Sequence, residues 1–347
     1  MKKGELYKAA GVDLTAADNA KKKIAALAKK TFTKGVVSDI GAFGGIFRFP
    51  EGSENLLLSS ADGVGTKLKV ATASKKYNTV GQDLVNHCVN DLLTLNATPL
   101  FFLDYIGHCD LPIERIAEIV EGLSIACSAN GLALIGGETA QMPGIYSSGD
   151  FDLVGFIVGS ASKQSLVDGS AIRPGDKLIA LQSNGLQTNG YSLARKILID
   201  SSAYALDDRP DILKGISVGE ALLAVHPSYL KPVKSLIDKG INISGMAHIT
   251  GGGIPGNLVR VLPKNCRAIV DVSQISIPPI FELIRHAGEV PISEMYDVFN
   301  MGAGFVIVLT ADMQNKALAL CESSEIFAVS CGEIVSGERS IKIDGVN

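Results

Sequence analysis

Short apolar segments alternate with amphipathic segments along nearly the whole chain, and this alternation constrains the fold most. Seven apolar runs are typical of strands: residues 56–59, 100–103, 133–135, 153–158, 178–181, 268–270 and 305–309. Five segments between or beside them have helical character: residues 81–97, 113–129, 190–200, 279–286 and 312–322. Interleaved strands and helices predict an α/β fold of the α+β kind, with mixed sheets.

The chain is expected to form two domains. At 347 residues it is long for a single hydrophobic core. The polar stretch 168–176 (DGSAIRPGD) contains Gly and Pro and separates two strand-rich halves. We therefore expect an N-terminal domain of residues 1–168 and a C-terminal domain of residues 169–347. Helix 113–129 is expected to end at Gly131, because glycine readily adopts the left-handed conformation of a C-cap.

Composition and charge exclude several classes of function. A net charge of −4 gives no long-range attraction to nucleic acid or an anionic membrane, so a phosphate ligand must be held locally. The six cysteines show no CxxC pair and no Cys/His spacing typical of zinc. The start of the chain, MKKGELYKAAG, lacks the apolar stretch of a signal peptide. No apolar run approaches the ~20 residues that span a bilayer. We expect a soluble, cytoplasmic protein.

One segment combines glycines with an acid in a way that is typical of phosphate or metal binding. In residues 56–68 (LLLSSADGVGTKL) an apolar strand ends at Asp62. The residues that follow include Gly63, Gly65, Thr66 and Lys67. Glycines let backbone N–H groups converge on an anion, a lysine adds a positive charge, and a carboxylate can hold magnesium. Neither the Walker A nor the Rossmann spacing is present. A tight strand-to-helix turn is the structural alternative.

Two further glycine-containing segments have the same character. In residues 132–146 (LALIGGETAQMPGIY) an apolar strand is followed by Gly137 and the acid Glu138, with a β-turn as the alternative interpretation. Residues 41–47 (GAFGGIF) are poorly suited to a helix or a strand. A mobile lid over a phosphate and a plain surface turn are both left open.

Helix 81–97 carries a polar stripe along one face. Its members are Asp83, Asn86, His87, Asn90, Asp91 and Thr94. A solvated face is the simple interpretation, but exposed faces usually carry Lys, Glu and Gln, and Asp and Asn are weak helix formers. The stripe is better explained as the lining of a polar cavity, with Asp91 or Asp83 holding a metal ion. His87 alone is more often structural than catalytic. The residues themselves thus predict a magnesium–nucleotide or similar phosphate ligand.

The second half offers two candidate sites for a substrate phosphate. In residues 183–195 (SNGLQTNGYSLAR), Asn189 and Gly190 lie near an expected helix start, where free N–H groups favour anions. Residues 248–253 (HITGGG) place three glycines beside His248. An ordinary N-cap and an ordinary loop are the respective alternatives.

Taken together, the motifs resemble those of the phosphoribosylformylglycinamidine cyclo-ligase family, also called aminoimidazole ribonucleotide synthetases. The matching segments, in order, are residues 10–13 (AGVD), 41–47, 62–68 (DGVGTKL), 89–92 (VNDL), 99–105 (PLFFLDY), 136–144 (GGETAQMPG), 188–193 (TNGYSL), 247–253 (AHITGGG) and 299–304 (FNMGAG). The resemblance implies a homodimer whose N-terminal domains pair into a central β-barrel, with a C-terminal α/β domain on each flank. The implied reaction is the ATP-dependent ring closure of formylglycinamidine ribonucleotide to aminoimidazole ribonucleotide, with release of ADP and phosphate.

The same resemblance implies roles for individual residues. Asp62, Asp91 and Glu138 would bind Mg²⁺, with Asp83 a weaker candidate. The implied catalytic residues are Asp62, Asp91 and Lys67, of which Lys67 would contact phosphate. The ATP site would also include Gly41, Gly44, Gly45, Gly63, Gly65, Thr66 and Gly137, with residues 41–45 forming a mobile flap. The implied substrate contacts are Gln187, Thr188, Asn189, Gly190, His248, Gly251, Gly252 and Gly253.

The chain departs from the family's pattern at several positions, which leaves alternatives. Gln187 stands where the family usually has a histidine, and glutamine cannot move a proton near neutral pH. Gln141, Ala42 and residues 255–256 also depart from the pattern. One alternative is another ATP-using enzyme of the superfamily, such as selenophosphate synthetase, thiamine-monophosphate kinase or the hydrogenase maturation protein. The other is a catalytically silent nucleotide-binding paralogue, which the retained cluster of acids opposes.

Overall fold

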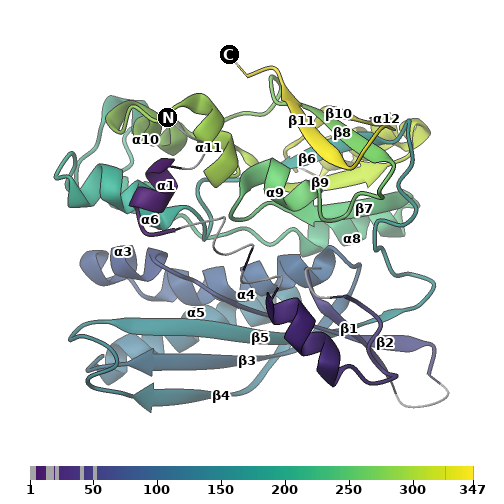
Figure 1. The fold of residues 1–347 in the computed structure, drawn as a ribbon. Helices are drawn as coiled ribbons and strands as arrows, with labels where there is room; N and C mark the ends of the chain where they lie inside the picture. Colours follow the sequence, from purple (N-terminus) through teal and green to yellow (C-terminus); the bar gives the residue numbers. More distant parts are fainter. Residues whose placement is uncertain are drawn as a thin grey trace.

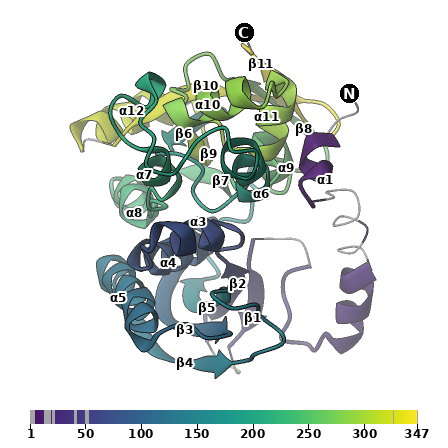
Figure 2. The ribbon, with the colours of Figure 1, turned by 90° about the vertical axis from the view of Figure 1, so that its left-hand side faces the viewer.

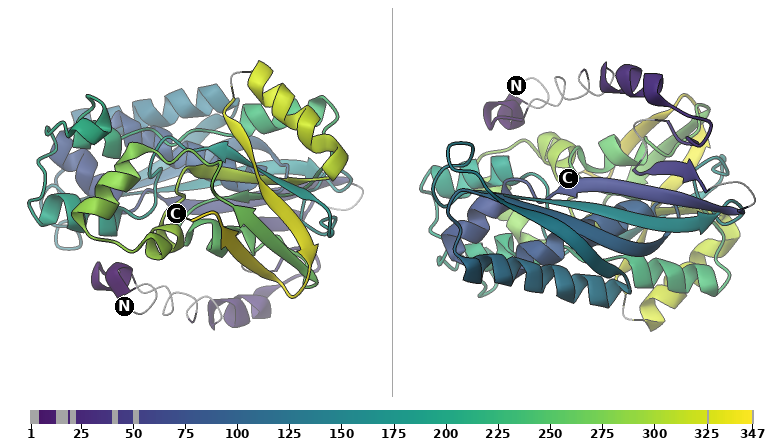
Figure 3. Two further views of the ribbon diagram at one scale, coloured as in Figure 1. Left: turned by 90° about the horizontal axis from the view of Figure 1, so that it is seen from above. Right: turned by 90° about the horizontal axis from the view of Figure 1, so that it is seen from below.

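The N-terminal half is a five-stranded sheet with helices on one face (Figures 1 and 2). In this computed structural model, residues 5–12, 19, 23–39, 43–49, 53–324 and 326–346 are described. The strands are β1 (Gly45–Arg48), β2 (Asn55–Gly63), β3 (Thr98–His108), β4 (Ala133–Gln141) and β5 (Phe151–Ser162), in the spatial order β1-β2-β5-β3-β4. Only β3 and β4 pair in parallel. Helices α3 (Lys67–Ser74), α4 (Asn78–Leu93) and α5 (Ile113–Asn130) lie on the face toward the C-terminal half, and Figure 3 shows the opposite face uncovered by the described helices.

The C-terminal half contains a six-stranded mixed sheet. Its strands are β6 (Lys177–Gln182), β7 (Ile243–His248), β8 (Cys266–Asp271), β9 (Ala303–Leu309), β10 (Ala328–Ser336) and β11 (Ser340–Asp344), in the order β11-β8-β10-β6-β9-β7. Strands β11 and β8 pair in parallel and the other pairs are antiparallel. The accompanying helices are α6 (Tyr191–Arg195), the π-helix η2 (Lys196–Asp200), η3 (Asp211–Leu213), α7 (Val218–Leu222), α8 (Leu230–Asp238), α9 (Gly253–Leu258), α10 (Pro279–Ala287), α11 (Ile292–Val298), η4 (Ala311–Met313) and α12 (Gln314–Ser323). The expected α/β fold with mixed sheets is confirmed.

The apolar runs identify seven of the eleven described strands. All seven expected strands lie within β2, β3, β4, β5, β6, β8 and β9. Strand β9 is buried at every residue, which explains its continuous apolar run. Gly131 caps α5 with a left-handed φ of 72°, as expected. Strands β1, β7, β10 and β11 were not anticipated, because their sequences are short or rich in Gly and polar residues.

Helix α4 lies between the N-terminal sheet and the C-terminal half (Figure 1). Every member of its polar stripe is buried, with exposed fractions between 0 and 9%. The stripe is therefore neither a solvated face nor the wall of an open cavity. It holds the loop between α7 and α8: Asn86 Nδ2 donates to the His226 carbonyl at 2.7 Å, and the His226 N–H donates to Asp83 Oδ1 at 2.7 Å. Burial between the halves explains why the stripe lacks lysine.

The connection between the two sheets runs from Ser162 to Lys177, and stretch 168–176 lies within it. A boundary at residue 168 stays a prediction. The first described helix, α1 (Glu5–Ala9), packs against the C-terminal half, because the backbone N–H groups of Leu6 and Tyr7 donate to Glu294 Oε1 at 2.9 and 3.2 Å. Among the described residues, no helix combines the length and the apolar character needed to cross a membrane.

Candidate functional site

Two of the predicted metal ligands lie together at the junction of the two halves. Asp62 lies near the end of β2 and Asp91 near the end of α4, and their oxygens lie within 4.8 Å of one another and of a ring nitrogen of His87. Asp62 Oδ2 is 2.7 Å from His87 Nε2. Asp91 Oδ1 is 2.8 Å from His248 Nδ1, and its Oδ2 accepts from Ser60 Oγ at 3.3 Å. Carboxylate oxygens are the hard ligands that Mg²⁺ prefers, so this pair of acids is a candidate site for the ion.

The neighbouring charges keep Asp62 ionised. Its side chain is 42% exposed, whereas that of Asp91 is 10% exposed, so Asp62 is the more accessible of the two acids. Burial acts to raise the pKa of Asp62, but the charge and hydrogen bond of His87, together with the Gly63 N–H, lower it to about 2. Burial acts to lower the pKa of His87, and Asp62 outweighs this effect and raises it to about 9. An ionised, partly exposed carboxylate is what a metal ligand requires.

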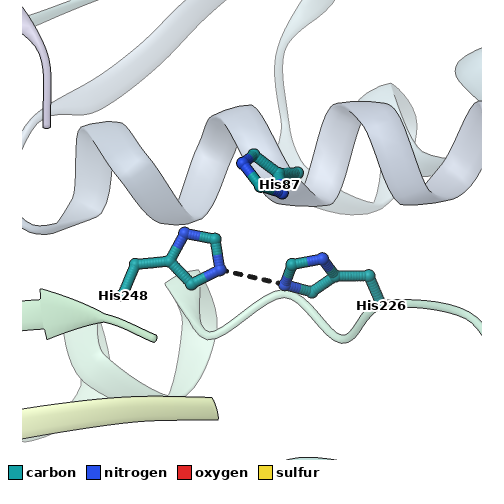
Figure 4. A group of neighbouring side chains, drawn as sticks. All are labelled: His87, His226 and His248. Carbon is teal, nitrogen blue, oxygen red and sulfur yellow. Dashed lines mark hydrogen bonds between the residues drawn. The ribbon is translucent and has the colours of Figure 1, made fainter. Parts of the chain in front are cut away.

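Three buried histidines lie together beside these acids, and Figure 4 shows the three rings. His87 comes from α4, His226 from the loop after α7, and His248 from the end of β7; their ring centroids lie 5.0 to 5.4 Å apart. The Nε2 atoms of His226 and His248 are 3.1 Å apart. Burial lowers the pKa of both of these histidines. His248 is 0% exposed and contacts Asp91, so the structure does not support its predicted role as a direct substrate contact.

The environment of Lys67 also does not support the phosphate contact that was predicted from the sequence. Its side chain is 0% exposed, and its ammonium lies 2.7 Å from Asp83 Oδ2. The remaining two protons are used in donation to the carbonyls of Gln187 at 3.0 Å and Ala224 at 2.8 Å. The same contacts occupy Asp83, the weaker metal candidate. A lysine whose three donors are already engaged joins the two halves of the molecule and is not available to a nucleotide.

The connection from β2 to α3 remains open to a ligand. Gly65 has a left-handed φ of 68°, and no atom lies within 4 Å of the position a Cβ would take there. Thr66 is exposed, and its Oγ1 lies 3.1 Å from Ser192 Oγ on α6 of the other half. Gly63 donates its N–H to Asp62 Oδ1 at 2.7 Å. This segment therefore lies beside Asp62, as the sequence predicted.

The predicted flap borders a cavity of about 440 Å³. Gly41 lies outside the described residues, while Gly44 and Gly45 line the cavity with Ser60, the residue that contacts Asp91. A Cβ at Gly44 would lie 3.1 Å from the Ser59 carbonyl, so glycine fits the close approach of the two chains. The guanidinium of Arg260 from the C-terminal half lies 3.9 Å from the ring centroid of Phe43. The cavity thus reaches Ser60, the neighbour of Asp91, and Arg260 of the second half packs on one of its lining residues, Phe43.

The two predicted phosphate loops of the second half come together. A Cβ at Gly251 would lie 3.3 Å from Asn189 Oδ1, which places the loop at Thr188–Gly190 against the loop at Gly251–Gly253. Glycines at 190 and 253 are explained by packing, because a Cβ would collide with the Phe299 ring or the Tyr296 carbonyl. Of the other residues in these two loops, Thr188 is 8% exposed and Gly252 has a left-handed φ of 94°.

Gln187 does not face this junction. Its side chain is 1% exposed, and its Nε2 donates to the Tyr229 hydroxyl at 2.8 Å. Its Oε1 is buried without a hydrogen-bond partner among the described residues. The structure does not support a direct substrate contact for Gln187.

Glu138 is the predicted metal ligand that the fold separates from the others. Glu138 on β4 pairs with Tyr105 on β3. Asp62 on β2 pairs with Gly155 on β5, and Gly155 pairs with Asp104, the residue before Tyr105 on β3. Neighbouring pleat positions point to opposite faces, so Glu138 lies on the uncovered face and Asp62 on the helix-covered face. Three strand spacings, ~14 Å, separate β4 from β2. Within one chain Glu138 does not join Asp62 and Asp91. Gly137 is explained by its neighbour, because a Cβ there would collide with Asp104.

Three residues of the site were not predicted from the sequence. Ser60 lies two residues before Asp62 in a strand, so the period of two could have placed both on one face. His226 and Arg260 are isolated in the sequence and reach the site only through the packing of the two halves. No local pattern identifies them.

Comparison with known proteins defines the class. The chain has the two-domain fold of the AIR synthase related proteins: residues 33–161 match the model of their N-terminal domain and residues 173–344 that of their C-terminal domain. Solved structures with this fold include thiamine-monophosphate kinase from Stenotrophomonas maltophilia K279a, with a TM-score of 0.64 and 17% identity over 92% of this chain and 94% of that one. Hydrogenase maturation protein HypE in complex with ATP has a TM-score of 0.62 and 15% identity over 87% and 85%. These similarities establish the fold alone.

Curated relatives are much more similar in sequence. The phosphoribosylformylglycinamidine cyclo-ligase of Myxococcus xanthus (strain DK1622) is 44% identical over 337 residues, which is 96% of this chain and 97% of that protein. The cyclo-ligase of Carboxydothermus hydrogenoformans is 45% identical over 340 residues, 97% of this chain and 98% of that protein. The chain belongs to the phosphoribosylformylglycinamidine cyclo-ligase family.

Proposed function

We propose that the protein closes the imidazole ring of aminoimidazole ribonucleotide from formylglycinamidine ribonucleotide, using ATP and releasing ADP and phosphate. The observation that carries this proposal is the pair of carboxylates, Asp62 and Asp91, at the junction of the two halves in a chain of this family. The partners are a small-molecule substrate and a second copy of the chain. No feature of the charge calls for nucleic acid, and we place the protein in the cytoplasm.

The chemistry requires activation of a poor leaving group. The formyl amide oxygen of the substrate attacks the γ-phosphorus of ATP, and ADP leaves. The neighbouring amidine nitrogen then attacks the formyl carbon, the C–O bond breaks, and phosphate departs with the former formyl oxygen. Catalysis of this kind depends on positioning and on neutralising phosphate charge.

The residues divide this work between the two halves. Asp62 and Asp91 would hold Mg²⁺, which neutralises phosphate charge when it is bound. Gly63, Gly65 and Thr66 lie beside Asp62 and suit the nucleotide phosphates. The flap cavity at Gly44 and Gly45 suits the rest of the nucleotide. The adjoining loops at Thr188–Gly190 and Gly251–Gly253 suit the substrate's phosphoribosyl group, which places the two reactants on either side of the acids.

We assign nucleotide binding and dimerisation to residues 1–168 and a flanking α/β domain to residues 169–347. The uncovered face of the N-terminal sheet is the surface for pairing into a β-barrel. Phe156 is 46% exposed there, as expected for a surface that a partner covers. Glu138 lies on the same face. Asp62 lies near the end of β2, so we propose that Glu138 of a second copy passes around the strand end and joins the site that contains Asp62 of the first copy.

Mixing inactive variants tests this sharing of residues. We expect Asp62→Asn and Glu138→Gln each to be inactive alone. Mixed dimers, formed by refolding or coexpressing the two, contain one intact site, so about a quarter of wild-type activity returns. The control mixture of Asp62→Asn with Asp91→Asn should stay inactive, because both acids come from the same copy. No recovery in the first mixture would mean that Glu138 acts within its own chain or not at all.

The proposed activity is tested with purified protein, Mg²⁺–ATP and formylglycinamidine ribonucleotide. We expect ADP and the imidazole product to form in a one-to-one ratio. ATP turnover with another phosphorylated substrate, such as thiamine monophosphate, and none with this one would identify a different enzyme of the superfamily. ATP binding with no turnover of either substrate would identify a silent paralogue.

A further inference from the structure

The three buried histidines form a cluster that the proposed reaction does not use. His87, His226 and His248 are 3%, 0% and 0% exposed. One ring nitrogen from each lies within 4.8 Å of the others. Figure 4 shows His226 and His248 facing each other below His87.

The hydrogen bonds determine which nitrogen of His226 carries a proton. Asn90 Oδ1 accepts the Tyr229 N–H at 2.8 Å, so the other end of the amide is its NH₂ group. That group donates to the Pro227 carbonyl at 2.9 Å and lies 3.2 Å from His226 Nε2. A nitrogen that faces an N–H donor presents its lone pair. His226 Nε2 is therefore unprotonated.

The other two rings also have one nitrogen that is fixed by a hydrogen bond to a carboxylate. His248 Nδ1 lies 2.8 Å from the carboxylate of Asp91 and carries its proton there, which leaves a lone pair on Nε2 in the neutral ring. His87 Nε2 lies 2.7 Å from Asp62 and donates to it, so Nδ1, 2.6 Å from Thr188 Oγ1, is the nitrogen with a lone pair in the neutral ring. The unprotonated Nε2 atoms of His226 and His248 then lie 3.1 Å apart, and a cation bound there would take the His226 lone pair from the Asn90 NH₂ group. Such a contact is repulsive unless a proton or a cation lies between them.

We infer that His87, His226 and His248 bind a divalent transition-metal ion of the zinc type, separate from the Mg²⁺ of the nucleotide. Zinc is typically held by imidazole nitrogens at ~2.0–2.1 Å, so two ligands of one tetrahedral ion lie ~3.3 Å apart, close to the observed separation of His226 and His248. Nitrogen ligands select such metals over magnesium, which prefers oxygen.

The surroundings of the cluster match those of known zinc sites. Metal-binding histidines usually donate their second ring N–H to a carboxylate or carbonyl. Here His87 donates to Asp62 and His248 donates to Asp91. These two negative charges balance one divalent cation bound by three neutral rings, with the cation replacing any proton on His87 Nδ1. The ion would fix the orientation of both acids while leaving their second oxygens to the magnesium–nucleotide.

The test measures metal content and does not depend on turnover. Full-length protein without a polyhistidine tag is equilibrated with Zn²⁺, passed into metal-free buffer and analysed by elemental mass spectrometry. We expect one zinc per chain, resistant to excess Mg²⁺, and a rise in melting temperature with added Zn²⁺. When Co²⁺ replaces Zn²⁺, the wild-type protein should show the visible absorption of a tetrahedral site with nitrogen ligands. This measurement needs no variant.

Matched variants assign the site. His226→Leu should lose the zinc and its effect on melting temperature, whereas His286→Leu, the same change at an exposed histidine outside the cluster, should retain both. Asp91→Asn keeps all three rings and should weaken zinc binding by about 10- to 100-fold. Wild-type protein with less than a tenth of an equivalent of zinc would overturn the inference and leave a protonated His248 between the rings. Equal zinc in wild type and His226→Leu would also overturn it.

Discussion

Replacing Asp62 or Asp91 with asparagine is expected to reduce turnover by about 10²–10³-fold or more, the scale seen when one preorganised electrostatic contact to a transition state is removed. Asparagine preserves the shape of the side chain and removes the charge that would hold Mg²⁺. The two acids lie together with His87 at the junction of the halves, so each change affects the same ion. Turnover and the Mg²⁺ concentration for half-maximal rate should be measured together, and the latter should rise.

Asp271→Asn is the matched control. Asp271 lies on β8, and its carboxylate accepts the Ser273 N–H at 2.9 Å, away from the junction. Its substitution should leave turnover within about twofold of wild type. Wild-type turnover of Asp62→Asn or Asp91→Asn at limiting Mg²⁺ would contradict the metal assignment for that residue.

Lys67→Met is expected to destabilise the fold by about 3–5 kcal/mol, because it leaves Asp83 buried without its partner. Both side chains are 0% exposed and lie 2.7 Å apart. The double variant Lys67→Met/Asp83→Leu removes both charges and should recover most of this loss. Lys69→Met, two residues along the same helix, breaks an ion pair whose members are 49% and 30% exposed and should cost less than about 1 kcal/mol.

Urea unfolding of the three variants separates the two roles considered for Lys67. A large shift of the midpoint for Lys67→Met and a small one for Lys69→Met would establish Lys67 as a structural link between the halves. If Lys67→Met instead unfolded like Lys69→Met but lost turnover, the phosphate contact predicted from the sequence would be correct and the buried pair would be unimportant.

Local patterns predicted what depends on local structure. Apolar runs located seven of the eleven described strands, and Gly131 identified the end of α5 because a left-handed residue is needed there. The absence of lysine from the polar stripe of α4 correctly indicated that this face is not solvated. The same reasoning could not identify what covers the stripe, because the covering loop lies about 140 residues later in the chain.

The environments that could not be predicted from the sequence have a common physical origin in tertiary packing. Lys67 follows the glycines of a phosphate-type loop, yet the C-terminal half buries it against Asp83 and two carbonyls. Glu138 and Asp62 both lie next to glycine in the sequence. Strand β4, however, continues through Glu138 to Gln141, and its pairing with β3 places Glu138 on the opposite face of the sheet from Asp62. His226 has no pattern around it and becomes part of the site only when the two halves meet.

The most direct measurement of the proposed reaction follows the formyl oxygen of the substrate. Formylglycinamidine ribonucleotide labelled with oxygen-18 in its formyl group is incubated with the protein and Mg²⁺–ATP, and the released phosphate is analysed by mass. We predict one labelled oxygen in each phosphate and one imidazole product for each phosphate. Unlabelled phosphate alongside the imidazole product, or ADP formed without imidazole, would contradict ring closure through phosphorylation of the formyl oxygen.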